Sequence, residues 1–414
     1  MKKKHLIHII LISFALIFSI GSFAQTTLKN GPYRFSIERD DHQMIHFITS
    51  VKDSAGKKIM YIINGNDHML VDSIIVKRDS VFFELPFFES GFAAKIKENG
   101  NLSGVWIKKT GDAVRKLPFT AKYNDGLRFN VKKPSAFNIS GMWTTVFVNK
   151  ENKESNALGQ FSQKGNHITG TFLTPYGDYR FLEGVVSGDS LYLSGFDGSF
   201  ALYFTGKIIK GNQITGGKFY SGNADVQTWQ AQKDNNAVLK TPESMTSQKP
   251  YNGKLDFRFP DLEGNMVSIN DDRFKNKIVV IQIMGSWCPN CVDETKFIMD
   301  NYDYYTSKGV TFLGISYERT PNYTASVKAL QPFQKRFKIP YPILIPPVAV
   351  SDSLRTEKTL PQIGKINAFP STIFLDKHGN IKKIHTGFDG PATGVHYIKY
   401  KKEFEETINE LLKD

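Results

Sequence analysis

Short hydrophobic runs separated by turn residues dominate the first half of the chain. Between residues 143 and 229, turn pairs such as Gly-Asn and Gly-Asp recur roughly every 9 to 14 residues. This spacing is typical of antiparallel strands joined by tight turns. The runs between the turns read as strands at residues 167–172, 179–186, 191–194, 200–209 and 213–220. The pattern therefore predicts an antiparallel meander.

Within these runs, hydrophobic side chains often occupy every second position. Phe200, Leu202 and Phe204 alternate with smaller or more polar neighbours, which predicts one buried face and one wetter face. A sandwich or an up-and-down barrel satisfies that pattern. Residues before 130 are also strand-like but less regular, so we expect residues 25–231 to form a β-rich domain, divided near residues 130–140.

The pattern changes after a polar stretch with two prolines at residues 232–251, which we interpret as a linker. From residue 252 onward, strand-like and helix-like segments alternate, and the run Ile278 to Ile281 is fully apolar. Such a strand belongs in a sheet that is covered on both faces. The expected strands are 277–284, 310–317, 371–375 and 380–385, and the expected helices are 292–307, 321–337 and 399–413.

Composition supports a globular, β-rich protein. Of 414 residues, 40% are hydrophobic and 22% are charged, which excludes gross disorder and a membrane protein with many spans. Aromatic residues reach 13% and favour strands. We expect Trp106, Trp143 and Trp229 to fill β-cores, because large aromatic side chains bury most of their surface.

The start of the chain has the order of a secretory signal. Lys2 to Lys4 precede an apolar run from Leu6 to Phe23, and small residues follow around Ala24. We therefore predict a signal peptide at residues 1–24, and hence a periplasmic or cell-envelope location. The alternative is an uncleaved membrane anchor, since the run nearly reaches the length of a bilayer span.

The positive charge of the chain does not point to nucleic acid. The formal net charge is +13, and removing three lysines with the signal leaves +10 (13 − 3). The remaining lysines and arginines are scattered, which is typical of a solvated basic surface. We expect no nucleic-acid partner.

Cys288 and Cys291 are the only two cysteines, and their spacing is open to several interpretations. A disulfide across so short a loop restrains little of the unfolded chain. A closed zinc site needs two more ligands, and His378, His385 and His396 lack paired ligand spacing. Copper and a peroxidase remain minor alternatives. A redox couple needs no residue beyond the two cysteines themselves.

The position of the pair suits redox chemistry, because it lies where a buried strand ends and a helix begins. The positive end of a helix favours a thiolate, the reactive form of cysteine. Pro289 can occupy the first helical turn without losing a needed hydrogen bond. We expect Cys288 to be the exposed nucleophile and Cys291 to resolve a mixed disulfide.

Several motifs together resemble the TlpA/ResA-like branch of the thioredoxin superfamily. They are the sequence Trp-Cys-Pro-Asn-Cys at 287–291, the following Glu294, and Phe-Pro-Ser-Thr-Ile-Phe-Leu-Asp-Lys-His-Gly-Asn-Ile at 369–381. The resemblance covers residues 252–414 and leaves the β-rich region outside. It implies a C-terminal α/β thioredoxin-like fold, which together with the strand pattern before it predicts a multidomain protein with an N-terminal all-β part.

The resemblance also implies roles for individual residues. Trp287 matches the aromatic residue beside the nucleophile, and with Pro289 it would contact the substrate. Pro370 matches the cis-proline that faces the disulfide. Phe369 departs from the smaller β-branched residue often found before that proline, so the choice of target protein is open.

Glu294 matches an acidic residue that such exported enzymes place three residues after the second cysteine. It could carry protons during resolution, or it could stabilise the first helical turn, as Asp293 could equally do. Gln282 stands near the place of a buried aspartate in cytoplasmic thioredoxins and cannot titrate. We expect Gln282 to be a buried structural residue.

The sequence thus predicts an exported thiol-disulfide oxidoreductase that reduces disulfide-containing target proteins. It needs no cofactor beyond the redox-active Cys288–Cys291 pair, and its electron donor would be a membrane thiol-relay protein. The alternative is a β-domain that binds a partner, glycan or lipid-like ligand, with an accessory redox domain.

Overall fold

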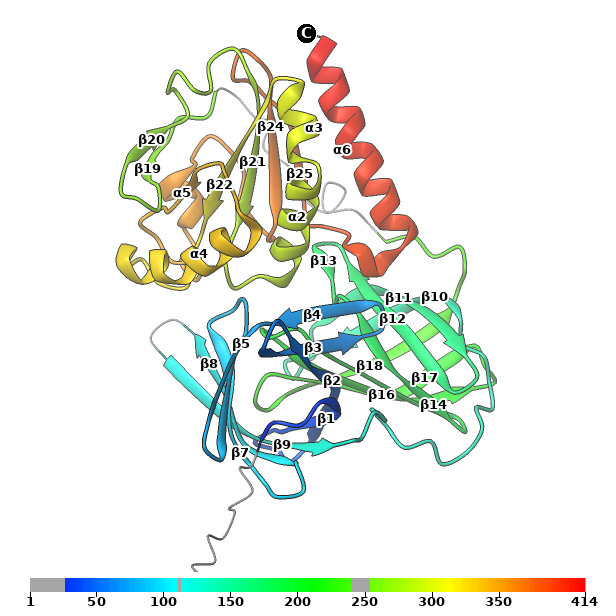
Figure 1. Cartoon of the computed structure of the whole chain (residues 1–414). Helices are drawn as coiled ribbons and strands as arrows, with labels where there is room; N and C mark the ends of the chain where they lie inside the picture. The colour runs from blue at the N-terminus through cyan, green and yellow to red at the C-terminus, as the bar shows by residue number, and fades with distance from the viewer. Residues whose placement is uncertain (1–26, 111–112, 240–253, 414) are drawn as a thin grey trace, which may run out of the picture.

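The computed structural model describes residues 27–110, 113–239 and 254–413, which form two antiparallel sheets followed by an α/β domain (Figure 1). The predicted signal peptide at residues 1–24 lies outside the described residues. So does most of the predicted linker at 232–251. The all-β N-terminal part and the thioredoxin-like C-terminal part confirm the expected fold class.

The first sheet has nine strands in the order β4-β3-β2-β1-β9-β8-β7-β6-β5. Stacked and edge-to-face phenylalanine rings, including Phe35 on Phe119 at 5.3 Å, fill its concave side. Trp106 is buried there, as expected. The strands are β1 Gly31–Glu38, β2 Met44–Ser54, β3 Lys57–Asn64, β4 Asp67–Val71, β5 Ser73–Lys77, β6 Ser80–Glu84, β7 Ser90–Ile96, β8 Leu102–Thr110 and β9 Ala113–Tyr123.

The second sheet closes into an up-and-down barrel. Its order is β11-β10-β18-β17-β16-β15-β14-β12-β13, and the additional pairing of β11 with β12 joins its two sides. Trp143 and Trp229 are buried in its core, as expected. The strands are β10 Gly141–Val148, β11 Glu154–Lys164, β12 His167–Thr174, β13 Gly177–Asp178, β14 Leu182–Ser187, β15 Ser190–Phe196, β16 Ala201–Ile209, β17 Gln213–Ser221 and β18 Asp225–Lys233.

Two strand predictions in the barrel need correction. On β16, Leu202 and Phe204 face the barrel core, but Ala201 and Tyr203 on the other face are also buried. The face expected to be wet is covered because it packs into the core of the first sheet. The strand predicted at 179–186 begins only at Leu182, because Arg180 takes a left-handed backbone conformation (φ 54°).

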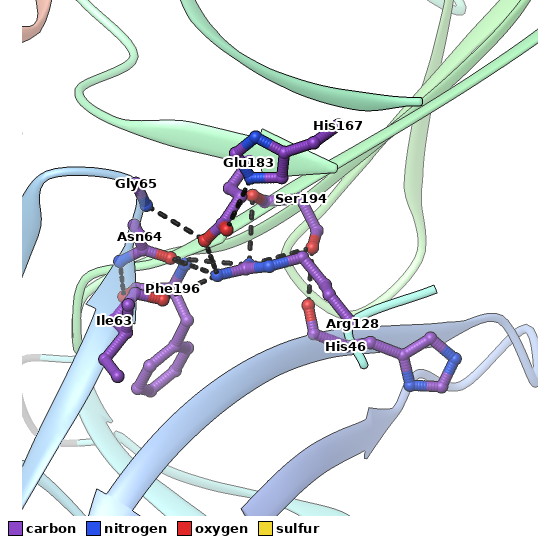
Figure 2. A network of polar contacts seen from close by, with 9 residues as sticks. All are labelled: His46, Ile63, Asn64, Gly65, Arg128, His167, Glu183, Ser194 and Phe196. Carbon is purple, nitrogen blue, oxygen red and sulfur yellow. Dashed lines mark hydrogen bonds and ion pairs between the residues drawn. The ribbon is translucent and has the colours of Figure 1, made fainter. Parts of the chain in front are cut away.

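A buried arginine ties the two sheets together (Figure 2). Arg128, in the connection between the sheets, donates to the Ile63 carbonyl of the first sheet at 2.5 Å and to the Ser194 carbonyl of the second at 3.2 Å. It also pairs with Glu183 at 3.0 Å. Asn64 adds a direct link, because its side chain donates to the Phe196 carbonyl at 2.8 Å.

The C-terminal domain has a five-stranded sheet in the order β23-β22-β21-β24-β25, where β21 is parallel to β22 and antiparallel to β24. Every residue of β21 is buried, which confirms the expected central strand. The elements are β19 Arg258–Pro260, β20 Met266–Ser268, β21 Ile278–Met284, α2 Pro289–Asp300, α3 Tyr302–Ser307, β22 Val310–Ser316, α4 Tyr323–Phe337, β23 Ile343–Leu344, α5 Arg355–Thr359, β24 Ser371–Leu375, β25 Ile381–Thr386, η1 Pro391–Thr393 and α6 Val395–Lys413.

The helix predicted at 292–307 is two helices. It begins earlier, at Pro289, because Cys288 caps its N-terminus, and it breaks at Asn301, where the backbone leaves the helical region (φ −120°, ψ 7°). The final helix begins four residues before its predicted start. The strand at 371–375 lies where we expected it.

The first sheet docks directly onto the C-terminal domain, beneath α4 in Figure 1. Phe87 and Phe88, from the turn after β6, pack against the hydrophobic core of that domain. The Phe87 ring stacks on Phe337 of α4 at 5.3 Å. Arg336 pairs with Asp72 at 2.8 Å on the same side. Because Phe88 belongs to that core, the two parts share a packed interface.

Replacing Arg128 should loosen the junction between the sheets. An Arg128→Met substitution leaves Glu183 without its buried partner, and we expect it to lower the free energy of unfolding by about 3–5 kcal/mol. Urea unfolding followed by tryptophan fluorescence measures the change. Lys207→Met removes an exposed ion pair with Asp189 and should change little. Equal effects of the two substitutions would contradict a structural role for Arg128.

Candidate functional site

The two cysteines lie at the start of α2, directly after β21. They are joined by a disulfide with their Cα atoms 5.2 Å apart. The Cys288 sulfur accepts a hydrogen bond from the Cys291 backbone N–H at 3.2 Å and so caps the helix. This sulfur therefore occupies the positive end of the helix, where a thiolate is stabilised after reduction.

The expected exposure of Cys288 is wrong. Its exposed fraction is 4%, against 0% for Cys291, so neither sulfur stands on an open surface. The barrel covers this end of α2, and Ser199 of the barrel donates to the Trp287 carbonyl at 3.1 Å. On the other side, the Cys288 sulfur lies 3.5 Å from the Phe369 carbonyl oxygen. Cys288 and Cys291 both belong to the buried hydrophobic cluster of this domain.

The aromatic and proline residues named from the sequence gather around the disulfide. The Phe369–Pro370 peptide bond is cis, as expected. The ring of Phe369 meets that of Trp287 edge-to-face at 5.3 Å. The Trp287 indole donates to the Tyr317 carbonyl at 2.8 Å, and Pro289 opens α2. The structure thus brings these four residues to one side of the cysteine pair.

Glu294 is buried in the same helix, with an exposed fraction of 0%. One carboxylate oxygen accepts from the Thr372 hydroxyl at 2.5 Å and from the Tyr400 hydroxyl at 2.7 Å. The other accepts from the Gln282 amide at 2.8 Å. Burial raises the pKa of Glu294, while the three hydrogen bonds oppose this shift. The group therefore binds a proton more readily than an ordinary glutamate.

Gln282 connects this carboxylate to the cysteines. It is fully buried, accepts from the Thr295 hydroxyl at 3.0 Å, and lies 3.4 Å from the Cys291 carbonyl through its amide nitrogen. These bonds confirm the expected structural glutamine. They also place Glu294 one side chain away from the backbone of the second cysteine.

Asp293, the neighbouring acid, has a separate partner that the sequence did not reveal. Arg180 of the barrel donates to its two carboxylate oxygens at 2.7 and 2.8 Å, in a fork-like pair. Asp178 anchors the same hairpin, because its carboxylate accepts from the Gly390 N–H at 2.7 Å. Burial, followed by the charge of Asp293, raises the pKa of Asp178 to about 7.

Glu318 is a second buried carboxylate that sequence reasoning missed. It accepts from the Ser286 N–H at 2.8 Å and from the hydroxyls of Ser286 and Ser316 at 2.7 Å each. Burial raises the pKa of Glu318. These bonds fix the loop that carries Trp287 toward the cysteines. The only available signal was its position directly after a predicted buried strand.

A cleft of about 370 Å³ runs between the barrel and the disulfide. Trp287, Cys288 and Phe369 line it from the thioredoxin-like domain. The barrel supplies the opposite wall, which includes Phe200, a large side chain that is 40% exposed. The cysteine pair is thus reached through a space bounded by both parts of the chain.

Glu294 should make stability depend on pH. Because its folded-state pKa is raised, the folded protein holds the proton more tightly than the unfolded chain. Stability should therefore fall as pH rises from the ordinary value of 4.5 through the folded-state value. Glu294→Gln should remove this loss, so the free energy of unfolding of the variant should rise relative to that of the parent as pH increases. Urea unfolding at pH 4.5, 6 and 8 measures the difference. Glu406→Gln, on an exposed part of α6, is the control and should keep the parental slope; a parental slope in Glu294→Gln would refute the assignment.

Replacing Arg180 should lower the fraction of reduced Cys288 that is thiolate at a given pH. Arg180→Met leaves the Asp293 charge unpaired in the second turn of α2, where a negative charge disfavours a nearby thiolate. We expect the pH midpoint of iodoacetamide alkylation of the reduced protein to move upward. The pH midpoint separates the two possible effects of the substitution. Looser docking of the barrel would change the plateau rate of alkylation, whereas a change in thiolate stability moves the midpoint. The double variant with Asp293→Asn should reverse the shift, and an unmoved midpoint would exclude the effect.

Comparisons with known proteins agree with this geometry. The Redoxin family model matches residues 251–397. Thiol-disulfide oxidoreductase ResA from Geobacillus thermodenitrificans is 30% identical over 132 residues, which are 32% of this chain and 66% of ResA. The chain thus spans just under two thirds of that relative. ResA from Bacillus subtilis is 24% identical over 154 residues, 37% of this chain and 74% of its own.

Among solved structures, a thiol-disulfide oxidoreductase from Bacteroides fragilis aligns with a TM-score of 0.26 at 21% identity. The alignment covers 35% of this chain and 96% of that protein. The β-region has no part in the family match, which begins at residue 251. The match to the Redoxin model and the ResA relatives together identify residues 251–397 as a ResA/TlpA-like region of the thioredoxin superfamily.

Proposed function

We propose that this protein is an exported thiol-disulfide oxidoreductase that reduces disulfides in target proteins through Cys288 and Cys291. The observation that carries the proposal is the cysteine pair at the N-terminus of α2, with the Cys288 sulfur accepting the Cys291 N–H. Similarity to ResA, named a thiol-disulfide oxidoreductase, supports the reaction class. The redox-active pair itself is the only electron carrier that the proposal needs.

The reaction proceeds by two thiol-disulfide exchanges. The Cys288 thiolate attacks one sulfur of the target disulfide, and the other target sulfur leaves as a thiolate that takes up a proton. Cys291 then loses its proton and attacks the Cys288 sulfur, which releases the second target thiolate. The target gains two electrons and two protons, and Cys288–Cys291 becomes the disulfide. A thiol-relay protein in the membrane restores the dithiol.

Glu294 has the role of proton acceptor for Cys291 in this scheme. Burial raises its pKa, so this carboxylate accepts a proton more readily than an ordinary glutamate does. Gln282, which contacts both Glu294 and the Cys291 carbonyl, holds the carboxylate in place. Asp293 cannot share this task, because Arg180 occupies both of its oxygens.

Export follows from the predicted signal at residues 1–24. No helix among residues 27–110, 113–239 and 254–413 is long and apolar enough to cross a membrane. The competing hypothesis is a β-domain that binds a partner, glycan or lipid-like ligand, with an accessory redox domain. Within it, a ligand held inside the barrel is less favoured. Phe147, Phe172, Phe204 and Phe219 pack against one another in the barrel interior, where such a ligand would have to lie.

Replacing the second cysteine should trap the intermediate. We expect reduced Cys291→Ser to form disulfide-linked adducts with oxidised insulin through Cys288, visible on non-reducing gels and removed by dithiothreitol. Its turnover in insulin reduction should fall at least roughly 100-fold, because the mixed disulfide is not resolved from within the protein. Cys288→Ser is the matched control and should form no adduct. If both variants form adducts equally, or if the parent protein does not reduce insulin, the proposal is wrong.

A further inference from the structure

The barrel forms one wall of the space through which a substrate reaches Cys288. The cleft of about 370 Å³ is lined on the barrel side by Asp178, Tyr179, Arg180, Asp197, Phe200, Leu202, Phe219, Ser221 and Gln227. This volume lies at the small end of ligand pockets, which span roughly 300–1,000 Å³. A folded partner surface, which needs about 800 Å² per side, does not fit into it. A narrow segment of a few residues does.

Contacts on both sides hold this wall in position. At one end, Arg180 pairs with Asp293 and Asp178 accepts the Gly390 N–H. At the other end, Ser199 donates to the Trp287 carbonyl. The separate docking of Phe87 on α4 adds a third attachment. The cleft is thus a built feature of the interface.

Phe200 is the most exposed apolar side chain of this wall. A structured turn presents it, because one Asp197 oxygen accepts from the N–H groups of Ser199 at 2.8 Å and Phe200 at 2.7 Å. Across the cleft lie the rings of Trp287 and Phe369. A side chain that enters between these rings meets aromatic surface on both sides, which favours an apolar group.

Charged groups of both signs surround the cleft. Asp178 and Asp197 line it, and Asp67 and Asp293 lie against Arg180. Arg180 is the one basic residue in the lining, and Asp293 already occupies it. Lys108, beside Phe200 with its amino group 4.9 Å from the ring, lies near Asp197. Arg319 lies over the Trp287 ring and Arg355 over the Phe369 ring, each at 5.5 Å, so the surrounding charges set no preference between anions and cations. A charged side chain placed between the aromatic rings still loses hydration that an apolar side chain does not need.

We propose that the barrel is the specificity-determining half of the substrate site, and that Phe200 selects a target disulfide with an apolar residue beside the attacked cysteine. The occupant is a narrow peptide segment that places an uncharged apolar side chain against Phe200. The inference rests on the proposed function, whose two exchange steps it leaves unchanged.

Two synthetic peptides test the selection. Each carries one internal disulfide, and they differ only in having leucine or aspartate after each cysteine. For the full chain we expect kcat/KM to favour the leucine peptide roughly 10-fold or more. Phe200→Ala should lower this ratio several-fold, mainly through KM for the leucine peptide, and Phe200→Leu should retain most of it. The reduction potential of the cysteine pair should stay unchanged in both variants.

Phe82→Ala is the matched control, because Phe82 is 44% exposed on β6, outside the cleft lining. It should leave the ratio at the parental value. Equal kcat/KM for the two peptides, or a Phe200→Ala ratio equal to that of Phe82→Ala, would overturn the inference. Those results leave the oxidoreductase proposal standing; failure to reduce insulin and both peptides alike would remove the proposed function instead.

Discussion

One buried ion pair joins the barrel to α2, the helix that begins at the cysteine pair. Arg180 of the barrel and Asp293 of α2 form a fork-like pair in which both side chains are about nine-tenths buried. Such a pair contributes little net stability, because the cost of removing two charges from water offsets their attraction. It does restrict how the two elements that carry the charges can pack, because any other arrangement would leave a charge buried without its partner. It therefore fixes where the barrel meets the cysteines. Together with the bonds of Asp178 to Gly390 and of Ser199 to Trp287, it holds the barrel wall of the cleft in place, and it also neutralises Asp293.

The same pair separates the roles of two adjacent acids in α2. Asp293 points out of the thioredoxin-like domain, and its carboxylate pairs with Arg180 of the barrel. Glu294 points inward, where Thr372, Tyr400 and Gln282 hold it and burial raises its pKa. Because successive helical residues lie about 100° apart, one residue can bind the covering domain while the next serves the chemistry. A helix with only one of these acids could not do both.

Local signals in the sequence were sufficient for the thioredoxin-like part. The apolar run of β21, the cysteine spacing and the cis-proline at Pro370 each depend on neighbouring residues. The burial of Cys288 could not be predicted in this way, because its surroundings include Phe369 and other residues far away in the chain. Arg180 and Arg128 were missed for the same reason. Charged residues in the connections between strands normally look like solvated surface, and only the docked arrangement shows their partners.

The barrel meets the cleft through its turns and through two side chains of its core. Closure of the sheet satisfies its strand edges, and Leu202 and Phe219 of the packed interior line the cleft beside the turns that carry Arg180 and Phe200. The hairpin that carries Asp178 and Arg180, and the turn that carries Phe200, are the parts nearest to the disulfide. Turns tolerate substitution more readily than cores. A fixed redox helix beneath a replaceable covering turn would allow the target preference to change while the cysteine chemistry stays constant.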